Sequence, residues 1–167
     1  MSATIEGQLD AWGIEYQKVE HPPVYTYAEA EQKVPELPGA HTKNLFLRDR
    51  KGRRHVLVVV SGDKRVDLQE LARLLNADKL GMASRERLQG HLGVEPGAVT
   101  LLALFNDVDK AVEVVIDRAV WSASALQCHP LVNTATLVIA RADVERFLEK
   151  TGHTWRVMDV PSRTEDG

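Results

Sequence analysis

The stretch Gly39-Ala40-His41-Thr42-Lys43-Asn44 runs directly into the apolar segment Leu45-Phe46-Leu47, and the rest of the chain is organised around it. A glycine followed by polar residues predicts a turn, and the apolar run predicts a strand that begins at Asn44. Proteins commonly hold reactive side chains in a short polar segment at the end of a rigid element. We therefore expect the functional site at the start of this strand.

A second polar segment lies far along the chain and repeats this arrangement. It reads His129-Pro130-Leu131-Val132-Asn133-Thr134 and supplies an imidazole and another amide. Proline disfavours a helical conformation in the residue before it, so His129 is expected in an extended and fixed position. We predict that the fold brings the two polar segments to one pocket.

The remaining segments alternate between strand and helix patterns. Apolar or alternating runs predict strands at residues 14–19, 44–48, 55–61, 80–83, 99–105, 111–117, 131–139 and 156–160. Caps and apolar spacing predict helices at residues 3–13, 26–34, 67–75, 84–93 and 141–149. Because hairpins and helical crossovers are mixed, we expect an α/β (α+β) fold, with a mixed, largely antiparallel sheet of about seven strands and helices packed outside.

Length and composition set outer limits on what the chain does. At 167 residues we expect one domain over residues 1–160, followed by a disordered polar tail at 161–167. A net charge of −3 argues against a protein that coats DNA or RNA non-specifically, although a local basic patch could still meet one RNA. One cysteine forms no internal disulfide, and we expect neither a signal peptide nor a membrane-spanning segment. We expect a cytoplasmic protein with no membrane partner.

The sequence contains no motif typical of a metal site or a cofactor site. The six histidines occur in no HExxH pattern and in no paired His–Cys spacing, and no glycine-rich nucleotide fingerprint is present. We therefore expect neither a metal nor a cofactor. Cys128 beside His129 suggests a nucleophilic pair, but adjacent residues on a strand point to opposite faces, so Cys128 is interpreted as a small core residue.

The residues of the two polar segments have structural alternatives. Lys43 at a strand start is as often a solvated flank as a functional cation, and Asn44 is often a turn former. A single histidine such as His129 is usually structural. Residue types alone leave both interpretations open.

Several segments together resemble one family. They are residues 21–26 (HPPVYT), 39–47 (GAHTKNLFL), 95–100 (EPGAVT) and 129–136 (HPLVNTAT). In this order they resemble the YbaK/ProX-type aminoacyl-tRNA deacylases, freestanding relatives of the editing domain inserted in bacterial prolyl-tRNA synthetases. The resemblance covers nearly the whole chain, and it is greatest to the branch that hydrolyses Ala-tRNA(Pro) rather than Cys-tRNA(Pro).

The resemblance implies a hydrolase that cleaves the ester between a wrong amino acid and the terminal adenosine of tRNA. It matches Lys43 to the essential lysine of the family, Asn44 to its neighbour, and His129 to a histidine that helps hold the adenosine. It matches Gly97, with the residues after it, to a loop whose backbone amides lie near the scissile carbonyl. Leu101 stands where that loop usually ends in proline, which leaves its rigidity open.

The remaining expected contacts concern substrate and tRNA. Substrate-binding residues are expected in the pocket walls and in the loops around it: Val24, Tyr25, Ala28, Leu45, Leu47, Ala98, Val99, Thr100 and Asn133. A basic cluster near the active turn is expected to contact tRNA or, alternatively, to form a solvated hairpin tip: Arg48, Arg50, Lys51, Arg53 and Arg54.

The expected substrate partner is the acceptor end of tRNA(Pro), and transient handover would come from prolyl-tRNA synthetase or an elongation factor. An aminoacyl ester is already activated, so hydrolysis needs positioning and oxyanion stabilisation more than a strong nucleophile. Two other functions stay open from the sequence. The chain could deacylate tRNA carrying another small amino acid (Cys, Ser or Thr), or it could bind tRNA or a synthetase without catalysis.

Overall fold

One eight-stranded sheet runs through the molecule, in the order β1-β7-β6-β2-β3-β5-β8, with β4 beside β2. The computed structural model describes residues 4–23, 28–29, 32, 34 and 36–163. Its strands are β1 (Gln17–Glu20), β2 (Ala40–Arg48), β3 (His55–Ser61), β4 (Gly81–Met82), β5 (Val112–Asp117), β6 (Ala125–Cys128), β7 (Ala135–Ala140) and β8 (Arg156–Met158). Four of the seven pairings are antiparallel and three are parallel, so the expected mixed sheet is confirmed.

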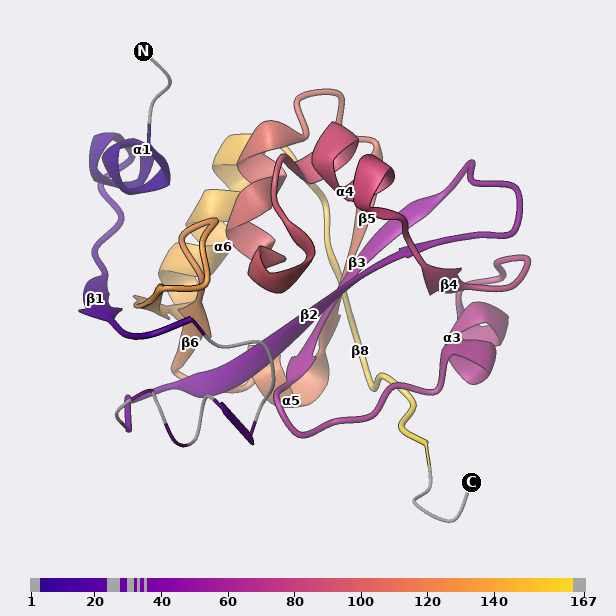
Figure 1. Ribbon diagram of the computed structural model, residues 1–167, viewed down its shortest axis with the longest axis horizontal. Helices are drawn as coiled ribbons and strands as arrows, with labels where there is room; N and C mark the ends of the chain where they lie inside the picture. The colour runs from indigo at the N-terminus through magenta and orange to yellow at the C-terminus, as the bar shows by residue number, and fades with distance from the viewer. Residues whose placement is uncertain (1–3, 24–27, 30–31, 33, 35, 164–167) are drawn as a thin grey trace.

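The described helices lie outside this sheet (Figure 1). They are α1 (Ile5–Ala11), α3 (Leu68–Leu74), α4 (Arg85–Leu92), α5 (Arg118–Trp121) and α6 (Arg141–Thr151), with the 3-10 helices η1 (Pro96–Ala98) and η2 (Leu101–Asn106). None of the helices in these described ranges is long and apolar enough to cross a membrane.

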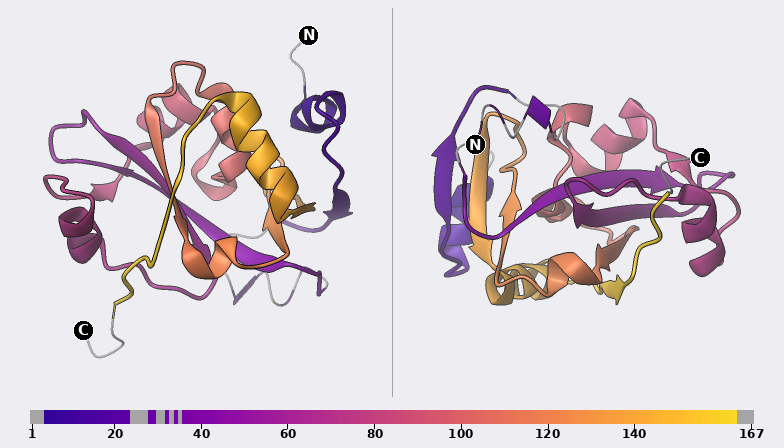
Figure 2. Two further views of the ribbon diagram at one scale, coloured as in Figure 1. Left: turned by 180° about the vertical axis from the view of Figure 1, so that it is seen from behind. Right: turned by 90° about the horizontal axis from the view of Figure 1, so that it is seen from below.

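Strand β2 joins the two halves of the sheet. Its first two residues pair with β6, residues 42–48 pair with β3, and its last two residues pair with β4 as well. Figure 2 shows β2 running along the molecule, with β1 and β7 towards one end and α3 towards the other. The position of β2 is therefore fixed by β3 along residues 42–48 and by β6 and β4 at its two ends.

The sheet buries both of its faces, as the apolar run of β3 predicts. Leu57 and Val59 pack with α4, α6 and η2 in what we call the inner cluster. Val56, Val58 and Val60 pack with α3 in what we call the outer cluster. Because successive strand residues point to opposite faces, one unbroken apolar run supplies both clusters.

Caps and glycines place most helices where the sequence predicts them. The side chains of Thr4, Asp67 and Ser84 accept hydrogen bonds from the backbone N–H three residues on, and these bonds start α1, α3 and α4. Gly93 ends α4 in the left-handed conformation that favours glycine. Of the helix expected at 26–34, residues 28, 29 and 32 are helical, and Thr26 with much of the rest lies outside the described residues.

Three local expectations were wrong. The turn expected before residue 44 is strand, since β2 begins at Ala40. The strand expected at 99–105 is η2, where the Thr100 hydroxyl accepts from the Leu102 N–H and burial on all sides removes any periodic pattern. Residues 131–134 are irregular, with Leu131 at φ +66°, so β7 begins only at Ala135.

The ends of the predicted elements also moved. β1 begins at Gln17 instead of residue 14, and β6 was not predicted at all. The expected disordered tail is paired in its first part, because Ser162 forms a bridge with Val66 and the Arg163 N–H donates to the Arg65 carbonyl at 2.7 Å.

We predict that Leu57→Ala lowers the free energy of unfolding by about 2–5 kcal/mol, because it opens a cavity in the inner cluster. Leu57 is fully buried at the centre of the sheet, whereas Val108 is 78% exposed. Urea denaturation of Leu57→Ala, with Val108→Ala as the control, measures the effect. Equal midpoints for the two variants would contradict this assignment of the core.

Candidate functional site

Lys43 and Asn44 lie inside β2 and point to opposite faces of the sheet. Lys43 pairs with Val60 of the outer cluster, and Asn44 pairs with Val59 of the inner cluster. Both side chains are half-buried. The two residues therefore do not reach a ligand from one turn, as the sequence suggested; they approach it from the two sides of a strand.

The Lys43 ammonium is held against the main chain. It donates to the Lys64 carbonyl oxygen, in the loop that follows β3. Burial lowers the pKa of Lys43, Asp63 acts in the opposite direction, and Arg65 lowers it further. An ammonium has three N–H donors, so the bond to Lys64 leaves two of them for a ligand.

Asn44 presents a buried acceptor. Its side-chain oxygen Oδ1 is shielded from solvent and accepts no hydrogen bond from any of the described residues. A buried polar atom without a partner is costly, and such atoms commonly mark functional sites. The oxygen is therefore available to an N–H or O–H group of a ligand.

Within the part of the chain that the structure describes, no strand pairs with the edge of β2 beside Asn44. On the side away from β3, β6 pairs with β2 as far as His41, and β4 pairs with it from Leu47 onward. The His41 carbonyl accepts from Gly62 on the β3 side, and the Phe46 carbonyl accepts from Ala83 on the other side. Alternation along the strand then directs the backbone N–H and C=O of Asn44 towards this unpaired edge.

His129 follows β6 directly and lies among other imidazoles. Its Nδ1 lies 3.3 Å from the Ala135 carbonyl, which selects the tautomer with the proton on Nδ1 and leaves Nε2 as an acceptor. Burial lowers the pKa of His129 most strongly, with His21 and His41 adding to this and the bond to Ala135 opposing it.

His41 connects the two predicted segments. It lies two residues before Lys43 on β2 and so on the same face of the strand. His41 also lies close enough to His129 to affect its pKa. His41 and Lys43 thus share one face of β2, and His129 lies close enough to His41 for their charges to interact.

The loop predicted to supply backbone amides lies on the inner side of the sheet. Gly97 is half-buried in η1, and the N–H of Ala98 donates to the Glu95 carbonyl at 2.9 Å. Ala98 packs in the inner cluster, which also holds Phe46, and Val99 packs against it. Thr100 is fully buried. The loop therefore lies on the face to which Asn44 points.

The residues expected to form the pocket walls differ in how deeply they are buried. Leu45 is half-buried against the outer cluster, and Leu47 lies wholly within that cluster. Asn133 is half-buried in the loop after His129, and Ala28 is exposed. Val24 and Tyr25 lie outside the described residues.

The basic cluster lies at the far end of the β2–β3 hairpin from Lys43 (Figure 1). Five residues of extended strand, about 17 Å, separate Lys43 from Arg48. Arg50 is paired with Asp78 at 3.3 Å, and Arg54 with Glu113 at 2.8 Å. Lys51 and Arg53 are exposed near the hairpin tip. The expected proximity to the site was wrong, and tRNA contact by this cluster stays a prediction.

Cys128 takes the structural role predicted for it. It is buried in the inner cluster, and desolvation raises the pKa of its thiol to about 12. Because the thiolate is the nucleophilic form, this side chain is unreactive at neutral pH. Among the residues that the structure describes, no group of three or more His, Cys, Asp or Glu side chains could hold a metal ion.

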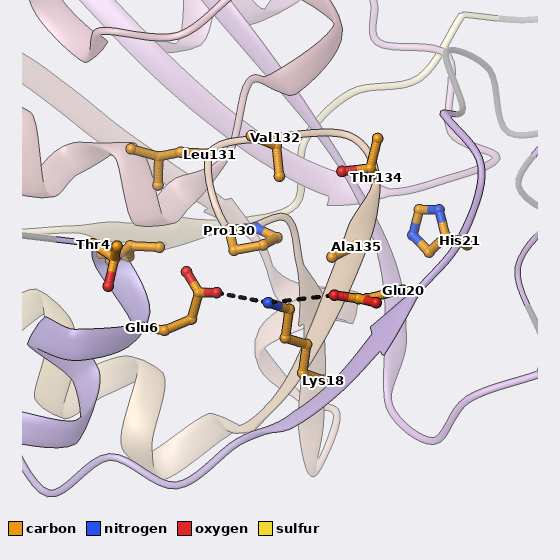
Figure 3. Close-up of a pocket in the computed structure, with 11 residues that line it drawn as sticks. Thr4, Glu6, Lys18, Glu20, His21, Pro130, Leu131, Val132, Thr134 and Ala135 are labelled. Carbon is orange, nitrogen blue, oxygen red and sulfur yellow. Dashed lines mark hydrogen bonds and ion pairs between the residues drawn. The ribbon is translucent and has the colours of Figure 1, made fainter.

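A pocket of about 640 Å³ lies between α1, β1 and the loop after His129 (Figure 3). Its walls include His21, Pro130, Leu131 and Val132. Lys18 lies between Glu6, at 2.9 Å, and Glu20, at 4.0 Å, so carboxylates outnumber cations on this wall. Lys43 is not among the residues that line it.

Residues 21–147 match the aminoacyl-tRNA editing domain family. The chain belongs to this family. It is similar to the prolyl-tRNA editing protein ProX of Acetoanaerobium sticklandii, with 39% identity over 153 residues that cover 92% of this chain and 93% of that protein. It is also similar to prolyl-tRNA synthetase associated domain-containing protein 1 of Danio rerio, with 43% identity over 152 residues, covering 90% and 82% of the two chains.

The fold agrees with this assignment. The crystal structure of hypothetical protein APE2540 superposes with a TM-score of 0.71 at 23% identity and covers 93% of this chain and 97% of that chain. The expected family and the expected class of enzyme, an aminoacyl-tRNA deacylase, are confirmed at the level of the family.

Two residues that set the geometry around Lys43 were not predicted from the sequence. Lys64 supplies the carbonyl that holds the Lys43 ammonium, and buried Asp117 pairs with the Lys64 ammonium at 2.9 Å. The nearest available signal is the acidic Asp117, which closes the apolar run at residues 114–116 of β5. Such a residue is easily interpreted as a helix cap.

We predict that His129 titrates below the ordinary histidine pKa of 6.5, because burial disfavours its imidazolium. When the pKa of the folded state is depressed, the unfolded chain takes up the proton first as the pH falls. The contribution of His129 to the free energy of unfolding is therefore complete above the ordinary pKa and is lost as the pH falls through the lower folded value.

An NMR titration of the His129 imidazole, assigned with His129→Gln, measures this midpoint. His129→Gln should also remove this part of the pH dependence of stability. A midpoint at or above 6.5 would contradict the buried, neutral imidazole described above.

Proposed function

We propose that this chain is a trans-editing hydrolase that deacylates mischarged Ala-tRNA(Pro) by cleaving the ester at the 3′-terminal adenosine. The observation that carries the proposal is the held ammonium of Lys43 on one face of β2 and the buried Asn44 oxygen on the other, in the part of the strand that neither β6 nor β4 pairs with. The names of the two relatives, a prolyl-tRNA editing protein and a prolyl-tRNA synthetase associated domain-containing protein, support the choice of tRNA(Pro) as the substrate tRNA.

The unpaired edge explains how two residues that point to opposite faces could serve one substrate. A ligand that lies against the edge of a strand is reached by side chains from both faces and by the backbone between them. Lys43 offers cationic donors from the outer face of β2, Asn44 offers a buried acceptor from the inner face, and the Asn44 backbone offers an N–H at the edge. The aminoacyl ester is proposed to lie there.

Each group then has a chemical role. The Lys43 ammonium holds a phosphate or ribose oxygen of the terminal nucleotide. His129 Nε2 accepts from a ribose hydroxyl, and Asn44 Oδ1 accepts from the substrate ammonium or a hydroxyl. Backbone N–H groups, from the Gly97 loop or from Asn44, stabilise the oxyanion as it forms.

The reaction needs no strong nucleophile from the protein. A water oxygen attacks the ester carbonyl carbon, and the adjacent free hydroxyl of the ribose assists by accepting its proton. The bond from the carbonyl carbon to the ribose oxygen breaks, and that oxygen takes up the proton. Free alanine and tRNA(Pro) are the products. The buried, protonated thiol of Cys128 supports a mechanism without a covalent intermediate.

Selectivity is proposed to come from size. Alanine is smaller than proline, so a narrow pocket rejects the correct product sterically, which attraction alone does not achieve. Leu45 is half-buried on the same face of β2 as Lys43. Among the described residues, it is the one that we propose as a wall of that pocket. Residues 1–160 are proposed to act as one editing domain in the cytoplasm, with substrate released from prolyl-tRNA synthetase or carried by an elongation factor.

We predict that Lys43→Ala reduces the single-turnover rate of Ala-tRNA(Pro) hydrolysis by about 100-fold or more, because an oriented donor at the reacting group is lost. Lys150→Ala, which removes an exposed lysine of α6, is the matched control and should leave the rate unchanged. Circular dichroism should show both variants folded. A Lys43→Ala variant with the wild-type rate would refute the assignment of this residue.

We also predict that the wild-type protein releases alanine from Ala-tRNA(Pro) faster than it releases Ser, Cys or Thr from the corresponding tRNA(Pro), and leaves Pro-tRNA(Pro) intact. A panel of these aminoacylated tRNAs, followed by loss of the labelled amino acid, tests the order. Faster release of another small residue would replace alanine in the proposal. Tight binding without release of any amino acid would indicate a protein that binds tRNA without catalysis.

A further inference from the structure

Lys64 and Asp117 form a buried arrangement behind Lys43 that neither catalysis nor the sequence motifs explain. The Lys64 ammonium bonds the Asp117 carboxylate at 2.9 Å and the Val160 carbonyl at 2.7 Å. The Lys64 backbone carbonyl in turn accepts from the Lys43 ammonium. One residue thus connects a buried carboxylate to the proposed catalytic lysine.

The Asp117 carboxylate bonds Lys64 and does not cap the helix that follows it. Asp117 is the N-cap residue of α5, and aspartate at this position ordinarily accepts hydrogen bonds from the first helical turn. Here its side chain makes no cap bond and is 2% exposed. One oxygen accepts from the Val160 N–H at 3.0 Å, and the other accepts from Lys64.

The loop that carries Lys64 is fixed from the other side by the C-terminal segment. The Asp67 N–H donates to the Pro161 carbonyl at 2.9 Å, and the Arg163 N–H donates to the Arg65 carbonyl at 2.7 Å. The loop is therefore bound to residues 160–163 along its length and to β5 through Asp117. Its backbone has little freedom to move the carbonyl that Lys43 contacts.

We propose that Lys64 and Asp117 are positioning residues for Lys43. The Asp117 carboxylate fixes the Lys64 side chain, the fixed loop presents the Lys64 carbonyl, and that carbonyl orients the Lys43 ammonium on the outer face of β2. The proposal rests on the proposed function for the role of Lys43, but the orientation of Lys43 is a property of the free protein.

A rotamer-rich lysine gains from such support. An unrestrained lysine side chain loses much of its rotamer freedom when a ligand fixes it. A lysine that a carbonyl already holds has lost much of this freedom on folding, so less is lost when the ligand binds. Misplacement of a catalytic group by about 1 Å can cost about 100-fold in rate, so loss of the support should appear in the rate of the chemical step.

The test compares Lys64→Met and Asp117→Asn with Asp107→Asn. Asp107 is a matched control because it is also a buried carboxylate, 4% exposed and paired with His153 at 2.8 Å, and its pair has no contact with Lys43. Lys64→Arg serves as the rescue variant, since its guanidinium retains donors for Asp117 and the Val160 carbonyl.

The first readout needs no substrate. ¹³C relaxation of the Lys43 Cε group, assigned by its absence from Lys43→Ala, should show a restricted side chain in the wild type, Lys64→Arg and Asp107→Asn. It should show a mobile side chain in Lys64→Met and Asp117→Asn. Equal order of Lys43 in all folded variants would overturn the proposal, whether or not the protein hydrolyses Ala-tRNA(Pro).

The second readout is single-turnover hydrolysis of Ala-tRNA(Pro) below the melting transition of every variant. Lys64→Met and Asp117→Asn should lower the maximal rate by about 10- to 100-fold with the half-saturating enzyme concentration unchanged, and Lys64→Arg should recover most of it. A loss no greater than that of Asp107→Asn would overturn the positioning role. A wild-type protein without hydrolysis, but with Lys43 released in Lys64→Met, would instead overturn the proposed function alone.

Discussion

The pairing of β2 with three different strands is the constraint on which the site depends. β6 holds its beginning, β3 holds most of its length, and β4 holds its end. Because neither β6 nor β4 covers its middle, a short edge stays unpaired in the centre of a sheet that is otherwise continuous. Strand geometry then dictates which side chains reach that edge and from which face.

Two further consequences follow from this placement. A lysine within a strand that faces a packed layer is partly desolvated, which lowers its pKa, and it needs a polar partner. The Lys64 carbonyl supplies this partner without neutralising the charge, so the ammonium keeps donors for an anionic or hydroxyl-bearing ligand. On the other face, Asn44 keeps a buried oxygen without a partner, which a bound substrate would satisfy.

The sequence predicts well those parts of the fold that local chemistry determines. The β-branched run 55–61 was assigned as a strand covered on both faces, and Asp67 and Ser84 were assigned as helix caps, all as the structure has them. The turn expected before Asn44 failed because a glycine and polar residues also suit a strand whose partners lie far away in the chain. η2 was mistaken for a strand because burial on every side hides the helical period.

For the site, the resemblance carried by short motifs proposed Lys43, Asn44 and His129, and their roles stay a prediction. The structure places Lys43 and Asn44 on opposite faces of β2 and His129 directly after β6. Nothing local in the sequence could show that a lysine in the loop after β3 and an aspartate 53 residues later form a pair. Such contacts depend on tertiary packing, so a pair of this kind becomes visible only in the folded structure.

The most direct measurement is a crystal structure of the protein with a short acceptor-stem RNA that ends in 3′-alanylamino-adenosine, in which a stable amide replaces the ester. The account predicts that the amide carbonyl lies at the unpaired edge of β2, within hydrogen-bond distance of the Asn44 backbone, with Lys43 and His129 on the adenosine. An alanyl-adenosine bound elsewhere, for example in the pocket of Figure 3 and away from Lys43, would contradict it.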